Sequence, residues 1–263
     1  MNSIKDMISD KEKPQDCEVH GQYISKNYFG QIWGKCPDCS KQEAEARIER
    51  EKAEGEAQKK ERAIKLWAAK IGHAQIPERF RDRTLNSYIA KNPGQETALA
   101  FAQDYANNFE EICKTGRSVI FVGKPGTGKT HLAIGIALQI MVRHTVLFTT
   151  VQRAIRRVKD TWTKGSEESE TDAINAIAFP DLLIMDEVGV QFGSEFERQI
   201  MFDILNERYE KRKPSILLSN IAPGELGPYL GDRVTDRLRE DGGKMIAFDW
   251  ESHRRNSTQG ETK

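Results

Sequence analysis

The stretch Gly123-Lys-Pro-Gly-Thr-Gly-Lys-Thr130 decides which fold we expect for this chain. It fits the phosphate-binding loop (P-loop) pattern in full, with a β-branched run at 118–122 before it and a helical pattern after it. Gly126 and Gly128 allow the backbone to curl, so that successive N–H groups can point at phosphate oxygens. A glycine-rich turn with an adjacent lysine is the alternative, and the complete pattern in this context disfavours it.

The end of this loop offers ligands for a nucleotide and its metal ion. Lys129 can place a positive charge between the β- and γ-phosphates, and Thr130 offers a hydroxyl group to Mg²⁺. The helix that starts near Lys129 adds the positive end of its dipole. We therefore expect ATP to contact the whole loop and the residue after it: Gly123, Lys124, Pro125, Gly126, Thr127, Gly128, Lys129, Thr130 and His131.

Polar residues also follow two of the later strands that the sequence predicts. The apolar run at 181–185 leads into Asp186 and Glu187, at the edge of the sheet beside the P-loop. Asp186 can hold the water shell of Mg²⁺, and Glu187 can orient and deprotonate the attacking water. Asn220 follows the run at 215–219 and could help to position that water, although asparagine is also a common turn residue. Solvated acids at an ordinary strand end are the alternative for the two carboxylates.

Five strand-like runs alternate with helical segments in the C-terminal part of the chain. They lie at 118–122, 145–149, 181–185, 215–219 and 244–248. Because such alternation requires crossover connections, the sequence predicts an α/β fold with a parallel sheet and helices on both faces.

Several segments together resemble the DnaC-type helicase loaders of the AAA+ class, in the DnaC/IstB-like family. They are residues 123–133, 186–191, 209–214, 230–239 and 248–254, and the resemblance covers roughly residues 76–256. It implies an ATPase core whose five-stranded parallel sheet has the strand order 5-1-4-3-2. It also implies a loader that uses ATP to place the replicative DNA helicase (DnaB-type) on single-stranded DNA during replication initiation, and that assembles into spirals as a homo-oligomer.

Two other functions remain open on the sequence alone. The IstB-type helpers of transposases, which act on duplex DNA, share the same core and are the nearest competitor. A third hypothesis is an adaptor that binds ATP only as a folding switch. Glu187 counts against this adaptor, because a carboxylate at its position supports hydrolysis.

The run Gly231-Asp-Arg-Val-Thr-Asp-Arg-Leu-Arg239 places Arg233 and Arg237 on one face of a helix. By motif position, the resemblance makes Arg237 the first candidate and Arg233 the second for an arginine finger. Such a finger stabilises charge on the γ-phosphate, usually in the site of a neighbouring subunit, so this role requires an oligomer. A solvated helix with Asp–Arg pairs is the plainer alternative.

The segment 152–162 is basic and ends in an aromatic residue. Arg153, Arg156 and Arg157 could neutralise phosphates while Trp162 stacks on a base, which is the usual design of single-strand binding. A solvated helix with Trp162 in the core fits the sequence equally well.

Cys17-x-x-His20 and Cys36-x-x-Cys39 form two short chelating pairs. Together they match a structural zinc (Zn²⁺) site with four ligands and no open catalytic position, whereas a chance set of thiols with an exposed histidine is the alternative. The remaining cysteine, Cys113, falls in a helical pattern and is expected to be a buried thiol. We expect the zinc module to dock the helicase through contacts or a small core made by Tyr23, Tyr28, Phe29 and Trp33.

Composition and charge bound the rest of the interpretation. The 263 residues carry 40 Lys+Arg and 40 Asp+Glu, so zero net charge argues against attachment to nucleic acid by bulk charge alone. No apolar run reaches the roughly 18 residues of a membrane span, and the N-terminus lacks a secretory signal, so we expect a cytoplasmic protein without a membrane partner. We divide the chain into a zinc-binding module at 1–40, a charged helical linker at 41–75 that Gly55 weakens, the ATPase domain at 76–256 and a disordered tail at 257–263.

Overall fold

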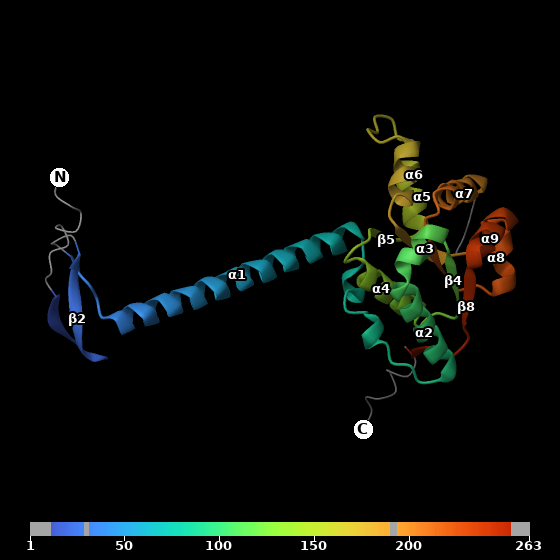
Figure 1. The fold of residues 1–263 in the computed structure, drawn as a ribbon. Coiled ribbons are helices and arrows are strands. Elements are labelled where there is room, and N and C mark those ends of the chain that lie inside the picture. Colours follow the sequence, from blue (N-terminus) through green and yellow to red (C-terminus); the bar gives the residue numbers. More distant parts are fainter. Residues whose placement is uncertain (1–11, 29–31, 190–193, 254–263) are drawn as a thin grey trace, which may run out of the picture. The chain divides into compact units, whose positions relative to one another are not determined.

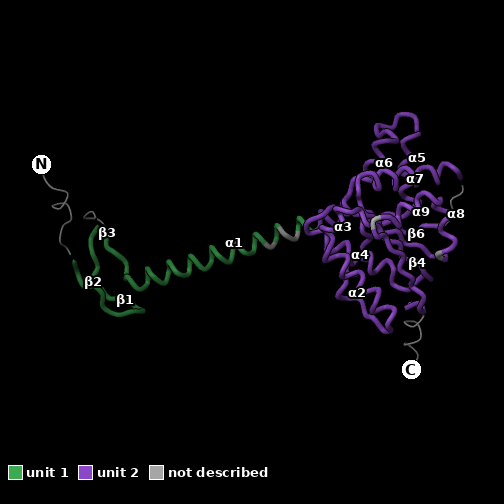
Figure 2. Tube along the Cα trace, turned by 45° about the vertical axis from the view of Figure 1, so that its right-hand side comes forward, with its two compact units in different colours: residues 1–67 green, residues 68–263 purple. Residues whose placement is uncertain are grey.

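The computed structural model describes residues 12–28, 32–189 and 194–253. The chain forms two compact units, Met1–Trp67 and Ala68–Lys263 (Figure 2). The expected tail at 257–263 and Phe29 of the expected docking contacts lie outside the described residues.

The first unit contains a small antiparallel sheet of three strands: β1 (Glu12–Cys17), β2 (Gly21–Tyr28) and β3 (Ile32–Trp33). Cys17 pairs with Gly21 at the closed end of the β1–β2 hairpin, so His20 lies in the tight turn between them. Gly21 has a φ of +78°, a left-handed conformation that glycine adopts without steric cost. The hairpin therefore brings Cys17 and His20 close together.

One long helix, α1 (Pro37–His73), follows this sheet. It begins before the expected position 41, because proline suits the first helical position, where its missing N–H group has no intrahelical partner. This early start places Cys39 in the first turn. The helix continues through Gly55, since one glycine costs only about 1 kcal/mol relative to alanine in a helix.

The second unit is built on a five-stranded sheet: β4 (Val119–Gly123), β5 (Val146–Thr150), β6 (Leu182–Val188), β7 (Ser215–Ser219) and β8 (Lys244–Phe248). Their order in space is β5-β6-β7-β4-β8, and every neighbouring pair is parallel. Read from the other edge and counted along the chain, this order is 5-1-4-3-2. The expected α/β fold and strand order are therefore confirmed.

Helices cover both faces of this sheet (Figure 1). One face packs against α2 (Pro93–Asn107), α3 (Phe109–Thr115) and α4 (Lys129–Ile140). The other packs against α5 (Val151–Asp160), α6 (Glu170–Ala178), α7 (Glu195–Glu210), α8 (Leu226–Leu230) and α9 (Asp232–Arg239). Alternate strand residues such as Ile120 and Phe121 enter the two separate apolar clusters, as in parallel sheets buried on both sides. Among the described residues, no helix is long and apolar enough to cross a membrane.

Short 3₁₀ helices connect these elements: η2 (Glu78–Phe80), η3 (Leu85–Ser87), η4 (Pro223–Glu225) and η5 (Glu240–Gly242). The amino ends of β6 and β7 are fixed by Arg208 of α7, whose side chain is buried. Its guanidinium donates to the carbonyl oxygens of Ala178 and Pro214 and to Oγ of Ser215. Burial lowers the pKa of Arg208 to about 9, so this group is still charged at neutral pH.

Candidate functional site

The P-loop follows β4, a strand with neighbours on both sides, and leads into α4. Gly126 and Gly128 have φ values of +81° and +102°, the left-handed conformations that the curled loop requires. No side chain caps the amino end of α4, which begins at Lys129. The dipole and the first N–H groups of this helix are therefore available to an anion.

Lys129 contacts the P-loop itself, and Thr130 connects the loop with the carboxylate of Asp186 in β6. Nζ of Lys129 donates to the carbonyl oxygens of Gly123 at 2.6 Å and Lys124 at 2.9 Å, and the side chain is buried. Oγ1 of Thr130 donates to Oδ2 of Asp186 at 3.1 Å. Because hydroxyl and carboxylate oxygens both suit Mg²⁺, this pair fits a magnesium ion between β6 and the loop.

Glu187 follows Asp186 in an unusual backbone conformation. Its φ is +64°, and its N–H group donates to Oδ1 of Asp186 at 2.7 Å. The pairing of β6 with β7 also shifts in register between Met185 and Val188. A left-handed conformation outside glycine costs about 1–3 kcal/mol and is found preferentially at functional sites. The backbone at this strand end is thus specialised, and the Glu187 side chain is exposed to solvent.

A cavity of about 380 Å³ collects most of the residues expected to bind and hydrolyse ATP. Of the other loop residues, Gly123 is half-buried, Lys124 is exposed and Thr127 is buried. The expected residues that line the cavity are Pro125, Gly126, Gly128, Lys129, Thr130, His131, Asp186, Glu187 and Asn220.

Four further residues line the same cavity and were not expected from the sequence: Arg79, Phe80, Arg83 and His253. The first three lie in a segment without helical or strand periodicity, where the only signal is an aromatic residue between arginines. His253 belongs to a segment that carries the family resemblance without an assigned role. Arg79 and Arg83 add positive charge and Phe80 adds an apolar ring, which suits a ligand with phosphates and a base.

His131 lies at the rim of the cavity. Its Nε2 is 3.0 Å from the carbonyl oxygen of Thr84, and its ring stands edge-on to Tyr88 with the ring centres 5.1 Å apart. Burial lowers the pKa of His131, so the imidazole is neutral at neutral pH. Since the Thr84 carbonyl can only accept, the proton is on Nε2.

The two candidate arginine fingers, both on α9, differ in their surroundings. Arg233 is exposed near the start of the helix. Arg237 is half-buried, donates to Oδ1 of Asn206, and has its guanidinium 4.7 Å from the ring centre of Tyr209. Both of its partners belong to α7 of the same chain, so Arg237 helps to hold α9 against α7.

The expected DNA-binding residues lie along α5 and in the turn that follows it. Arg153 and Arg156 are exposed, and Arg157 is half-buried. Trp162 is 49% exposed, so the alternative that placed this ring in the core is wrong. The three arginines line one cavity together with Asp160 and Glu168, and Trp162 lies in the turn that follows α5.

Two acidic residues contact these side chains. Glu168 lies just before α6, and Glu170 is the first residue of that helix. Oε1 of Glu168 is 2.6 Å from Nη2 of Arg157, and Oε2 of Glu170 accepts from the Trp162 indole at 2.6 Å. The Trp162 ring also meets Phe196 of α7, with the ring centres 6.1 Å apart. Two of the four expected DNA contacts are therefore engaged by carboxylates of the same chain.

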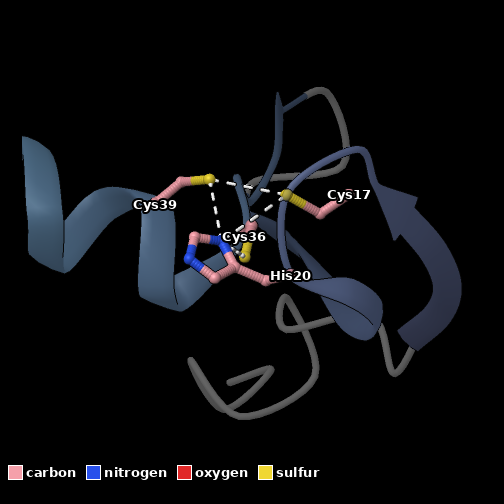
Figure 3. Close-up of side chains that lie close together, drawn as sticks. All are labelled: Cys17, His20, Cys36 and Cys39. Carbon is pink, nitrogen blue, oxygen red and sulfur yellow. Dashed lines mark hydrogen bonds between the residues drawn. The ribbon is translucent and has the colours of Figure 1, made fainter.

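The four expected zinc ligands converge in the first unit (Figure 3). Cys17 ends β1, His20 lies in the hairpin turn, Cys36 precedes α1 and Cys39 lies in its first turn. Their Sγ and Nδ1 atoms are all within 4.8 Å of one another, and Sγ of Cys39 is 3.4 Å from Sγ of Cys17 and 3.3 Å from Nδ1 of His20. A tetrahedral zinc ion with Zn–S bonds of about 2.3 Å requires ligand atoms about 3.5–3.8 Å apart, so the donor set fits zinc.

The pKa values of Cys17 and Cys39 in this cluster are shifted in opposite directions. Hydrogen bonds from the backbone N–H groups of His20 and then Val19 lower the pKa of Cys17 to about 6. The hydrogen bond with Cys17 and then burial raise the pKa of Cys39 to about 12. A cation in the cluster would favour ionisation of both thiols.

Cys113 lies in α3 of the second unit. It is only partly buried, so the expectation of a buried thiol needs correction. Burial nonetheless raises its pKa to about 11, which keeps the sulfur in the unreactive thiol form.

The parallel sheet with strand order 5-1-4-3-2, the P-loop after β4 and the carboxylate that accepts from Thr130 are those expected of a P-loop ATPase core of the AAA+ class. Over residues 44–257 the chain matches the family described as IstB-like ATP binding protein, and it belongs to that family.

The proteins similar to this chain in sequence include helicase loaders. The replicative helicase loader DnaC of Escherichia coli (strain K12) is 33% identical over 198 residues, which is 75% of this chain and 79% of the relative. The protein of the same name from Buchnera aphidicola subsp. Baizongia pistaciae (strain Bp) is 31% identical over the same shares of the two chains. The resemblance to the DnaC/IstB-like family is therefore confirmed, and these relatives do not favour the transposase helper.

Solved structures agree with this assignment. The crystal structure of the DnaC helicase loader gives a TM-score of 0.59 at 25% identity and covers 65% of this chain and 99% of that chain. AMPPCP-bound DnaA from Aquifex aeolicus gives a TM-score of 0.56 at 24% identity and covers 65% of this chain and 51% of that chain. The second likeness concerns the fold alone.

Proposed function

We propose that this protein is an ATP-dependent loader that places the replicative DNA helicase on single-stranded DNA during replication initiation. The observation that carries the proposal is the 33% identity to a helicase loader over 79% of that protein. The cavity lined by the P-loop, Asp186 and Glu187 supports it, because a loader needs a site that can bind and hydrolyse ATP. Such a protein works in the cytoplasm, where the replicative helicase acts.

Within this function, the second unit binds ATP with Mg²⁺ and hydrolyses it. Lys129, which contacts the loop carbonyls, also contacts the β- and γ-phosphates, and Thr130 and Asp186 hold the metal. Bound Mg²⁺ neutralises phosphate charge. Glu187 accepts a proton from the attacking water, which Asn220 helps to position.

Two further roles need a second copy of the chain and a DNA strand. Arg237, or Arg233 next to it, reaches the γ-phosphate in a neighbouring subunit of a spiral homo-oligomer. Arg237 then has to exchange its bond to Asn206 for the phosphate, whereas exposed Arg233 has no comparable contact with α7 to exchange. The surface made by Arg153, Arg156, Arg157 and Trp162 holds single-stranded DNA.

The domain at 1–40, stabilised by zinc on Cys17, His20, Cys36 and Cys39, docks the helicase, and the linker at 41–75 joins it to the ATPase domain at 76–256. Of the expected docking residues, Tyr28 is 55% exposed. Tyr23 instead donates to Oε1 of Gln15 at 2.8 Å, and the Trp33 ring lies under Lys13 at 4.2 Å. We therefore assign docking to Tyr28, and the other two rings to the small core of the module.

A pull-down with the cognate replicative helicase tests this proposal. The full-length protein should capture the helicase, and Tyr28→Ala should weaken the capture about tenfold, because truncating a central interface tyrosine commonly costs 1–2 kcal/mol. Val142→Ala is the matched control, since this residue is 66% exposed in the second unit and should leave capture unchanged. If the wild-type protein fails to bind the helicase, the loader function is wrong.

A further inference from the structure

A phosphate-binding loop needs its N–H groups turned towards the ligand and its carbonyl groups turned away. Because backbone dipoles are fixed to one another, holding the carbonyls outward is equivalent to aiming the N–H groups inward. In this chain the carbonyl oxygens of Gly123, Lys124, Gly126 and Thr127 all accept hydrogen bonds. The donors divide into two groups, which differ in whether they must also contact the nucleotide when it binds.

Lys129 supplies the first group of donors, and it also has to serve the nucleotide. Its Nζ holds the carbonyls of Gly123 and Lys124. In the proposed function this ammonium also contacts the phosphates, so its three N–H donors are divided between the loop carbonyls and the ligand. The Lys124 carbonyl keeps a second donor, Oγ1 of Thr127, at 2.8 Å.

The segment after β8 supplies the second group. The indole Nε1 of Trp250 donates to the carbonyl oxygen of Thr127 at 2.8 Å. The backbone N–H group of His253 donates to the carbonyl oxygen of Gly126 at 3.0 Å. Both donors meet loop carbonyls and not the N–H groups that would receive phosphate, so phosphate can enter without displacing these hydrogen bonds, although His253 also lines the cavity.

This segment is itself fixed by packing against the start of α2 and the end of β8. The Trp250 ring lies 4.9 Å from the Phe248 ring, measured between ring centres. It also covers Gly94 so closely that a Cβ atom there would lie 3.1 Å from the indole. The His253 ring meets Nε2 of Gln95, a side chain that is 3% exposed, at 3.2 Å. Trp250 and His253 therefore approach the loop from a rigid support.

We propose that residues 249–253 form a brace that keeps the P-loop carbonyls outward in both the free and the nucleotide-bound protein. Trp250 is then a positioning residue, which acts on the phosphates through the Thr127 peptide without touching them. This inference rests on the proposed ATP binding and adds a determinant of affinity outside the P-loop pattern. If the brace exists, the P-loop already has its phosphate-binding conformation before ATP binds. Less conformational entropy is then lost on binding.

Trp250→Phe tests the brace, because phenylalanine keeps an aromatic ring against Phe248 and Gly94 but lacks the N–H donor. With ATP and Mg²⁺ in a calorimetric titration of the full chain at 25 °C, we expect Kd to rise about fivefold, the typical effect of one neutral hydrogen bond. KM should rise by the same factor while kcat stays unchanged, since the contact is equal in ground and transition states. Trp67→Phe makes the same chemical change in α1 and should leave Kd unchanged.

A second pair of variants removes the other contact. His253→Pro deletes the backbone N–H group that reaches Gly126, whereas His253→Ala keeps it and loses only the ring. The brace requires a higher Kd for the proline variant than for the alanine variant. This pair also decides the question if Trp250→Phe does not fold.

Equal Kd values for Trp250→Phe and wild type, or for the two His253 variants, would overturn the brace. A merely structural role for Trp250 would lower the unfolding temperature but leave Kd of the folded protein unchanged. Lys129→Ala separates this outcome from failure of the proposed function. If the wild type binds ATP and Lys129→Ala does not, ATP binding stands even when the brace fails, whereas a wild type that binds no ATP refutes both.

Discussion

The two units of the chain are stabilised by different physical means. In Ala68–Lys263, apolar side chains such as Phe121 and Ile120 fill a core on each face of the sheet. Among the described residues of Met1–Trp67, only Ser25 and Cys36 are buried, and Cys36 is one of the four proposed zinc ligands. A sheet this small cannot bury enough apolar area to be stable by itself. The comparison teaches that a metal should control the first unit and leave the second unaffected.

Removal of zinc should give the largest effect and should be confined to the first unit. Structural zinc sites supply on the order of 10 kcal/mol of folding free energy, so a strong chelator or Cys39→Ser should unfold the hairpin and abolish helicase capture. Hydrogen exchange of the full chain would show loss of protection in β1 and β2. ATP affinity should not change, and a large rise in its Kd on chelation would contradict the separation of the two units.

Arg208→Met should give the converse result, with damage confined to the second unit. Without the guanidinium, the buried carbonyls of Ala178 and Pro214 and the hydroxyl of Ser215 lose a donor, which should cost about 3 kcal/mol of stability. Thermal unfolding would measure it, with Arg198→Met on the exposed face of α7 as the control. Equal unfolding temperatures for the two variants would show that the hydrogen bonds of Arg208 do not stabilise the second unit.

Glu187→Gln should affect ATP hydrolysis but not ATP binding by the second unit. Loss of a general base should lower ATP turnover about a hundredfold or more while ATP affinity remains, because Lys129 and the loop are intact. Steady-state hydrolysis and titration of the same preparation would measure both. Glu96→Gln, an exposed neutralisation on α2, should have no effect. Turnover of Glu187→Gln equal to wild type would exclude this residue from the mechanism.

Glu168→Gln should give the smallest effect, a gain of DNA affinity by about two- to threefold at low salt. The change releases Arg157, which is 40% exposed in its ion pair, for contact with a phosphate. Fluorescence anisotropy with an oligothymidine strand would measure it, and Glu96→Gln controls for the change of net charge. An unchanged affinity for Glu168→Gln would show that Arg157 does not bind DNA.

The sequence was informative wherever a function depends on consecutive residues. The P-loop, the strand that leads into Asp186 and the pairs Cys17/His20 and Cys36/Cys39 each lie within a few positions of chain, and regular runs of apolar residues predict the strands between them. Such local patterns were enough to predict the α/β fold, its strand order through the family resemblance, the four residues of the Cys/His cluster and most of the lining of the nucleotide cavity.

Contacts between distant segments could not be predicted in this way. Arg79 and His253 reach the same cavity from opposite ends of the second unit, and no spacing in the sequence relates them. The attachment of Arg237 to α7 and of Glu168 to Arg157 likewise depends on how helices pack. The hydrogen bond from Trp250 to the P-loop could not be predicted, because its acceptor is a backbone carbonyl. The sequence does not show which carbonyls need a donor.

Loading of the helicase on closed circular single-stranded DNA tests the central claim most directly, because such a circle has no end on which the helicase ring could thread. The readout is displacement of an annealed oligonucleotide in the presence of ATP. The account predicts that the wild-type protein stimulates displacement strongly, and that the chelated protein and Lys129→Ala, each defective in one unit, do not. No stimulation by the wild type, or full stimulation after chelation, would contradict it.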